Sequence, residues 1–193
     1  MDEPARQALR RRARAARQAH VAGLAAPVRR ALEAALADRV RPLLAGADMV
    51  ASYAATADEV DPRPLEAGLA SLCFPRVADS GGLGFHACRR EELARGAFGI
   101  AEPPESAPLA TPSILLVPLL LFDRNGGRLG QGGGHYDRAL RSLRAAGSVR
   151  AIGLAWDMQE AEALAMAPWD ERLDLVATPT RLIRCRVRAG AAA

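Results

Sequence analysis

The amino-acid sequence predicts an α/β protein: a three-layer sandwich in which helices cover both faces of a largely parallel sheet, with an N-terminal helical arm. Three observations carry this prediction. Short apolar runs alternate with helical stretches from residue 46 onward. The apolar run over residues 114–122 lacks a period of two, which is typical of a central strand covered on both faces. The 193 residues are 50% hydrophobic and 25% charged, which excludes a disordered chain, a collagen and a coiled-coil rod.

Two helices are predicted ahead of the sheet. The first spans residues 4–24 and opens at Pro4. The second spans residues 27–45, opens at Pro27 and carries an apolar face that includes Leu32, Leu36 and Val40. One face of the first helix carries a stripe of arginines at spacings of three or four residues, namely Arg6, Arg10, Arg14 and Arg17. Such a stripe indicates an anionic partner or a solvated face.

The other elements follow from the alternation of apolar runs with amphipathic stretches. Strands are predicted over residues 48–54, 72–77, 83–87, 114–122, 149–156 and 173–178, and helices over residues 62–71, 89–95, 136–146 and 158–166. Residues 99–113, rich in Pro and Ala, are predicted to form a loop. No internal repeat or linker divides the chain, so we expect one domain over residues 1–193: a basic arm and second helix (1–45), an α/β core (46–188) and a frayed tail (189–193).

The charge of the chain is unevenly distributed. The net charge is +4, and every basic residue is an arginine, so contacts with phosphate must come from Arg, backbone N–H groups or a metal. Residues 1–45 hold ten arginines and four acidic residues, a net charge of +6. A basic arm of this kind is compatible with nucleic acid, a membrane surface or a phosphorylated small ligand.

Cysteine spacing and hydropathy exclude several other classes of protein. Cys73, Cys88 and Cys185 lie far apart without a CxxC pair, so neither a zinc ribbon nor a disulfide framework is expected. No stretch reaches 18 apolar residues, and no charged-then-apolar signal segment opens the chain. We therefore expect a cytoplasmic protein without membrane contact. We also expect a monomer, although no feature of the sequence fixes the oligomeric state.

A glycine-rich segment over residues 122–138 carries the clearest chemical signal. It follows the predicted central strand and precedes a helix, the place where open α/β sheets bind ligands. Glycines let the backbone approach a ligand closely, and successive N–H groups with a helix N-terminus behind them form a cradle for an anion. Arg128 supplies a planar cation for phosphate, and Asp137 lies where a carboxylate can hold Mg²⁺ beside phosphates.

The glycine spacing alone matches neither common nucleotide-binding motif. No Gly-Lys-Ser/Thr follows, so the segment is not a Walker A loop. In a GxGxxG pattern counted from Gly130, the third glycine would fall on His135.

The full segment resembles the signature of the 5-formyltetrahydrofolate cyclo-ligase family, which is Pro-x-x-x-Phe-Asp followed by Arg-Leu-Gly-x-Gly-x-Gly-Tyr-Tyr-Asp. His135 stands where the family has the first of its two tyrosines, and Arg6 stands where it usually has Lys. The matching residues are Pro118, Phe122, Asp123, Arg128, Leu129, Gly130, Gly132, Gly134, Tyr136 and Asp137. Further segments resemble the family's markers in the same order: residues 6–10, 57–60, 73–75, 99–103 and 154–159, with Asp170 and Asp174.

The resemblance implies a fold and a reaction. The fold would be a Rossmann-like sheet of the NagB/RpiA/CoA-transferase type. The reaction would be the ATP- and Mg²⁺-dependent conversion of 5-formyltetrahydrofolate to 5,10-methenyltetrahydrofolate, a step of one-carbon metabolism. The formyl oxygen would take the γ-phosphate of ATP, N10 would attack the activated carbon, and phosphate would leave. Such chemistry asks the protein mainly for placement and neutralisation of charge.

The resemblance also implies roles for individual residues. ATP would be bound by Arg6, Arg10, Arg128, Leu129, Gly130, Gln131, Gly132, Gly133, Gly134, His135 and Tyr136. The folate would be bound by Ala54, Glu59 and Trp156, and by the loop residues Gln131, Gly132, Gly133, Gly134 and His135. Mg²⁺ would be held by Asp137 and Asp170.

Plainer interpretations stand beside these roles. Arg6 can be a solvated charge, Glu59 a cap for a helix beginning near Asp61, and Trp156 part of the core. Asp170 can be a helix cap or a surface acid, and Asp123 is expected to be a turn residue. Two other functions remain alternatives. One is a non-catalytic relative that binds nucleotide or folate, and the other is a nucleic-acid-binding protein that uses the arginine stripe.

Overall fold

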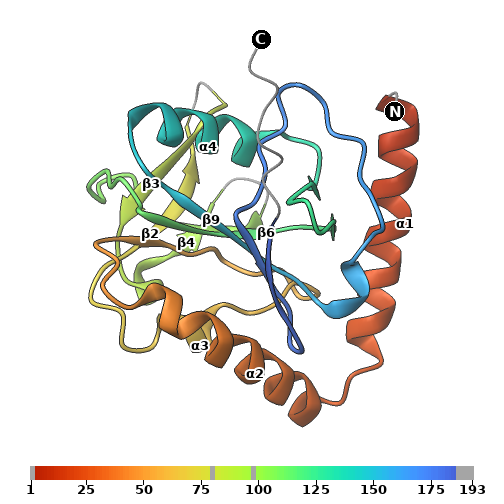
Figure 1. Ribbon diagram of the computed structural model, residues 1–193. Helices are drawn as coiled ribbons and strands as arrows, with labels where there is room; N and C mark the ends of the chain where they lie inside the picture. Colours follow the sequence, from red (N-terminus) through yellow and green to blue (C-terminus); the bar gives the residue numbers. More distant parts are fainter. Residues whose placement is uncertain (1–2, 79–80, 97–98, 186–193) are drawn as a thin grey trace.

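The computed structural model describes residues 3–78, 81–96 and 99–185, and it has the predicted architecture. A central sheet is covered on one face by α4 (His135–Ala146) and on the other by α2 (Ala26–Leu44) and the short α3 (Arg63–Glu66), as Figure 1 shows. The helix α1 (Glu3–Ala22) stands beside the sheet (Figure 1). The frayed tail predicted for residues 189–193 lies outside the described residues.

The seven-stranded sheet is parallel except at its two edges, as predicted. Its order is β11-β10-β9-β6-β1-β2-β3, in which β2 with β3 and β10 with β11 are the antiparallel pairs. The bounds are β1 (Val50–Ala51), β2 (Leu72–Val77), β3 (Leu83–Ala87), β6 (Ile114–Pro118), β9 (Arg150–Leu154), β10 (Leu175–Ala177) and β11 (Leu182–Arg184). The neighbouring parallel strands β1, β6, β9 and β10 end at one common edge.

The strand β6 explains why the sequence shows a continuous apolar run. Ile114 and Leu116 face the core under α2, whereas Leu115 and Val117 face the core under α4. The four side chains are at most 5% exposed. Both faces of the strand are therefore apolar, and the polar alternation of a half-buried strand is absent.

The two N-terminal helices form close to their predicted bounds. The first ends at Ala22, and the amide of the next residue, Gly23, bonds back to the carbonyls of Ala19 and His20. The second begins with Pro27 in its first turn, where a missing N–H costs nothing, and buries five side chains against the sheet. Among the described helices, none is long and apolar enough to span a membrane.

The predicted strand over residues 114–122 is broken. The strand β6 ends at Pro118, and β7 (Leu121–Phe122) pairs with β8 (Arg128–Leu129) in a separate hairpin. The turn between β7 and β8 is organised by Asp123, whose Oδ1 accepts the amides of Asn125 and Gly127, each at 2.9 Å. Asp123 is thus the turn residue that the sequence suggested.

Three helix predictions need correction. The helix predicted over residues 62–71 is only α3, because the chain turns at Gly68 with φ 86°. The segment 89–95 is a short 3₁₀ turn, η1 (Arg90–Glu92), followed by β4 (Ala94–Arg95), which pairs with β5 (Ala101–Glu102). The segment 158–166 has only η3 (Asp157–Gln159) and then runs irregularly, because Leu164 donates its amide to Asp123 instead of to a helix.

Candidate active site

Most of the residues singled out from the sequence lie at the carboxyl edge of the parallel strands. Ala54 and Glu59 follow β1, Trp156 follows β9, and the glycine loop of residues 130–134 follows the β7–β8 hairpin that extends β6. Ligands of open α/β sheets bind at this edge. The helix α1 lies against the same edge, because Arg17 of α1 donates to the carbonyl of Leu119 just beyond β6.

The glycine loop leads directly into α4. Gly132 has φ 110° and Gly134 has φ 63°, conformations that other residues adopt at a cost. Gly134 is the N-cap of α4, and no side chain caps that end of the helix. Residues 131–133 are exposed. The first-turn amides of a 12-residue helix and the loop backbone are thus available to an anion.

The arginine stripe of α1 is docked on the molecule. Arg6 pairs with Asp170 at 2.8 Å, and Arg14 bonds to Gln131. Arg10 pairs with Glu3 and lies so close to the loop that a Cβ at Gly132 would stand 3.4 Å from its Cζ. The side chains of Arg6, Arg10 and Arg17 are thus largely covered, at 12%, 12% and 2% exposed, so most of the stripe is not a solvated face.

Two atoms of this stripe lack partners. The Nε atoms of Arg6 and Arg10 are buried and form no hydrogen bond with any described residue. A buried donor without an acceptor is costly, and it is usually satisfied by a ligand or water. Together with the uncapped helix α4, these donors form a surface suited to phosphate.

Arg128 and Asp137 form an ion pair beside the loop. Arg128 is 6% exposed, and its Nη2 donates to Asp137 Oδ1 at 2.7 Å. Its Nη1 also donates to the carbonyl of Glu171. Burial lowers the pKa of the Arg128 guanidinium, and the charge of Asp137 opposes that shift. Asp137 therefore compensates the charge of a buried guanidinium beside the loop.

The two predicted metal ligands share one corner. Asp137 Oδ1 also accepts the amide of Glu171, the residue after Asp170, at 3.0 Å. Asp170 uses Oδ2 to accept from Arg6 and from the amide of Ala167. The other oxygen of each carboxylate accepts no hydrogen bond from the residues that the structure describes. No group of three or more His, Cys, Asp or Glu suited to a metal occurs among these residues, so the corner fits Mg²⁺ only when phosphate oxygens and water complete the shell.

Glu59 lies in a tightly held turn and does not cap a helix. The nearest helix, α3, begins at Arg63, and the amide of that residue is accepted by Asp61. Glu59 is 7% exposed and accepts the amide of Thr56 through Oε2 at 2.9 Å. Ala54 is half-buried next to Tyr53, earlier in the same loop. The capping alternative is therefore wrong, and the carboxylate is held at the edge of the sheet.

Trp156 belongs to the core. Its side chain is 1% exposed, its Nε1 donates to the carbonyl of Asp58 at 3.1 Å, and its ring lies 5.8 Å from that of His20. This is the plainer of the two interpretations of Trp156. The structure does not present the ring to a ligand, because Arg29 of α2 also lies over it, 6.0 Å from the ring centre.

His135 and Tyr136 begin α4. The Nδ1 atom of His135 lies 3.1 Å from the carbonyl of Gly81, in the turn between β2 and β3, and Arg138 donates to the same carbonyl. Burial raises the pKa of Tyr136, and the charge of Glu59 acts in the same direction while Arg128 opposes it. Tyr136 is therefore within electrostatic reach of both Glu59 and Arg128.

Two residues at this edge were not predicted as site residues. Gln159 is 2% exposed and donates to the carbonyls of Leu119 and Leu120, so it fastens η3 to the end of β6. Arg17 is also 2% exposed and contacts the Glu59 turn. The spacing of the stripe placed Arg17 on the right face of the helix, and nothing in the local sequence showed its burial.

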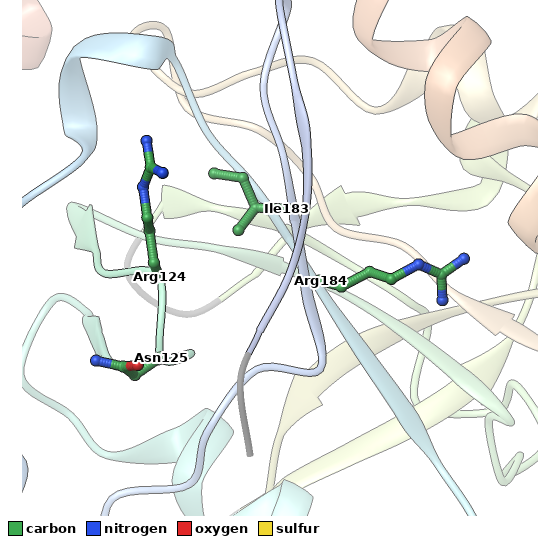
Figure 2. A pocket seen from close by; sticks show the side chains of 4 residues that line it. All are labelled: Arg124, Asn125, Ile183 and Arg184. Carbon is green, nitrogen blue, oxygen red and sulfur yellow. The ribbon is translucent and has the colours of Figure 1, made fainter. Parts of the chain in front are cut away.

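Two hollows of the described surface are lined by other residues. One of about 410 Å³ is lined by Arg124, Asn125, Ile183 and Arg184, and Figure 2 shows Arg124 and Arg184 extending away from each other. A second hollow of about 750 Å³ lies around α3 and η1. Neither of the two is lined by a residue that the sequence assigned to ATP, folate or metal.

Comparison with known proteins agrees with the motif and the fold. The sequence profile of the 5-formyltetrahydrofolate cyclo-ligase family matches residues 2–179. The chain belongs to this family. The 5-formyltetrahydrofolate cyclo-ligase of Escherichia coli K12 is 36% identical over 97 residues, which are 48% of this chain and 53% of that protein. The enzyme of that name from Haemophilus influenzae is 39% identical over 82 residues, 40% of this chain and 43% of that protein.

The structural match covers more of the chain than the sequence matches to curated relatives do. The alignment spans about half the length of the curated relatives that the chain matches. The solved structure of Aquifex aeolicus 5,10-methenyltetrahydrofolate synthetase superposes with a TM-score of 0.75 and 27% identity, covering 96% of each chain. The predicted family resemblance and α/β fold are thus confirmed.

Proposed function

We propose that this protein is a 5-formyltetrahydrofolate cyclo-ligase, which uses MgATP to convert 5-formyltetrahydrofolate to 5,10-methenyltetrahydrofolate, ADP and phosphate. The observation that carries the proposal is the convergence on one sheet edge of an uncapped helix N-terminus, a glycine loop and two arginines with unsatisfied donors. We expect it to act in the cytoplasm as a monomer.

The nucleotide half of the site is built around the loop. Arg6 and Arg10 would donate their unpartnered Nε groups to the phosphates, and the backbone from Arg128 to Tyr136 would surround them. Asp137 and Asp170 would hold Mg²⁺ through their free oxygens. Bound there, Mg²⁺ would neutralise phosphate charge and orient the γ-phosphate.

The folate half of the site lies further along α1. The contacts of α1 follow one another in the order Asp170, Gly132, Gln131 and Asp58, from Arg6 to Arg17. At 1.5 Å per residue, the eleven steps from Arg6 to Arg17 span roughly 16 Å. Phosphates at one end and the Glu59 turn at the other would place the formyl group near the middle of this span, beside Gln131 and Gly132.

The proposed chemistry needs charge and placement more than a base. The formyl oxygen attacks the γ-phosphorus and ADP leaves, giving a phosphorylated formyl group. N10 then attacks the activated carbon and loses its proton, the C–O bond breaks, and phosphate leaves with that oxygen and takes up the proton as the methenyl bridge closes. Arg6, Arg10 and Arg128 would oppose the negative charge that develops, and the loop would keep the two substrates in contact.

The substitution Asp137→Asn tests the metal assignment. It keeps an acceptor for Arg128 and for the amide of Glu171 but removes the charge that Mg²⁺ needs, so we expect at least a hundredfold loss of kcat. The variant should still fold, with a lowered melting temperature, because the buried Arg128 loses its counter-ion. The control is Asp38→Asn, which removes an exposed acid that pairs with Arg41 on α2. Normal Mg²⁺-dependent turnover by Asp137→Asn would show that the metal is held elsewhere.

A further inference from the structure

Arg17 is buried deeply for a charged side chain. It is 2% exposed, and the other two buried side chains of α1, Ala13 and Val21, are small and apolar. A buried guanidinium is tolerated only where carboxylates and carbonyls surround it. The groups that contact Arg17 therefore explain how its charge can be buried.

The partners of Arg17 come from two loops at the carboxyl edge of the sheet. Its Nε donates to Asp58 Oδ2 at 2.8 Å, and its Nη1 donates to the carbonyl of Leu119 at 2.9 Å. The same Nη1 lies 3.6 Å from Glu59 Oε1. One cation thus compensates two adjacent carboxylates, and it bonds directly to only one of them.

The turn that carries these carboxylates is fixed along its backbone. Each carbonyl from residue 57 to residue 60 accepts a side-chain donor: Ala57 and Glu59 from Arg29, Asp58 from Trp156, and Val60 from Tyr53. The backbone is therefore in place before any ligand binds. The backbone contacts do not fix the Glu59 carboxylate itself, whose orientation and charge depend on the groups around the side chain.

Glu59 keeps one oxygen for a ligand. Its Oε2 is used by the amide of Thr56, whereas Oε1 accepts no hydrogen bond from any described residue. At 3.6 Å, Arg17 attracts that oxygen without occupying its lone pairs in a hydrogen bond. A ligand with adjacent N–H donors, such as the amino-pyrimidine edge of a pterin, would find an acceptor that is charged, oriented and unused.

We propose that Arg17 is a positioning residue for folate recognition, which holds the Glu59 carboxylate ready for the pterin edge while leaving its Oε1 free. The inference rests on the proposed function of this site and adds a residue to it. Because Arg17 reaches the Glu59 turn and not the phosphate corner, its removal should weaken folate binding while leaving ATP binding nearly unchanged.

The experiment is a double-mutant cycle on steady-state kinetics. The variants are Arg17→Gln, Glu59→Gln and the double variant, with Arg12→Gln as control because it removes the same charge from an exposed position of α1. We expect Arg17→Gln to raise the KM for 5-formyltetrahydrofolate at least tenfold and to change the KM for ATP less than twofold. In the Glu59→Gln background, Arg17→Gln should add less than twofold, because its target is already gone.

A conservative variant separates positioning from folding. Arg17→Lys keeps the charge but cannot bond to Asp58 and Leu119 while facing Glu59, so we expect a folded protein with an intermediate folate KM. If Arg17→Gln fails to fold, the cycle is run with Arg17→Lys. An unchanged folate KM, or the same fold-change with and without the Glu59 carboxylate, overturns the inference. Wild-type protein that forms no methenyl product contradicts the proposed function itself, and the inference falls with it.

Discussion

Gly132 is a residue of the glycine loop against which Arg10 of α1 lies. Its φ is 110°, and a Cβ atom at this position would stand only 3.4 Å from Arg10 Cζ, which leaves little room for a side chain. The glycine leaves room for Arg10 beside the loop backbone, where we propose that the phosphates of ATP bind.

We predict that Gly132→Ala raises the KM for ATP about tenfold or more, because the added methyl group pushes Arg10 away from the loop. The backbone strain itself costs roughly 1 kcal/mol, since alanine disfavours this conformation. The matched control is Gly46→Ala, where φ is 75° and nothing lies within 4 Å of the added Cβ. Steady-state kinetics and thermal melts should show similar losses of stability but a raised KM only for Gly132→Ala. Equal KM values in the two variants would contradict the close approach.

At the scale of elements, α1 and α2 are held in different ways. The helix α2 buries Leu36, Ala37, Val40 and Leu44 in the core along with Glu33, whereas α1 buries only Ala13, Arg17 and Val21. The N-terminal half of α1 rests on ion pairs and on arginines with unpartnered donors. A segment with few buried apolar contacts, held mainly by polar contacts, is one that opens locally at a low free-energy cost. The N-terminal half of α1 is such a segment.

We predict that hydrogen exchange distinguishes these helices. Without ligand, the amides of residues 6–16 should exchange faster than those of residues 30–44. A magnesium complex of a non-hydrolysable ATP analogue should slow exchange in the first segment at least tenfold, because the phosphates satisfy Arg6 and Arg10. The helix α2 serves as the internal control and should not respond. Nucleotide binding that leaves α1 unprotected would mean that the arginines do not reach the phosphates.

Local sequence pattern located the long and strongly patterned elements well. The strands β2 and β3 coincide with the predicted ranges, and α4 begins one residue before its predicted start. The errors fall on short segments whose conformation is set by distant bonds. The helix predicted over residues 158–166 fails because Gln159 bonds to Leu119 and Leu120, about forty residues away in sequence.

In the candidate site, too, local sequence pattern was predictive and contacts between distant residues were not. Motif residues near one another in sequence, from Arg128 to Asp137, were found together, and parallel topology explains why Glu59 lies at the same edge. The burial of Arg17 was not predictable, because its partners Asp58 and Leu119 are 41 and 102 residues away. A helical stripe shows which face is used, but not which member of it becomes buried.

At the scale of the whole molecule, we expect the buried thiols to make the free energy of unfolding decrease at alkaline pH. Burial raises the pKa of Cys73 and of Cys185 from an ordinary value of 9.0 to about 12. As pH rises above about 9, the unfolded chain loses these protons before the folded protein does. The unfolded state then binds fewer protons, so the free energy of unfolding falls with rising pH between about 9 and 12.

We predict that the urea midpoint is nearly constant around neutral pH and declines steadily above pH 9. The variant Cys73→Ala, which removes one buried thiol, should decline less steeply over the same range. Urea melts of both proteins at a series of pH values measure this directly. Equal slopes would mean that Cys73 does not supply the alkaline sensitivity.

The central claim is that one edge of the sheet joins ATP and a formyl folate in a single reaction. The most direct test follows the ultraviolet absorbance of the methenyl product and the release of phosphate in the same sample, with purified protein, 5-formyltetrahydrofolate, ATP and Mg²⁺. The account predicts one phosphate for each methenyl group formed, and neither product when ATP, Mg²⁺ or the folate is omitted. Phosphate release without the methenyl product, or the methenyl product without ATP, would contradict it.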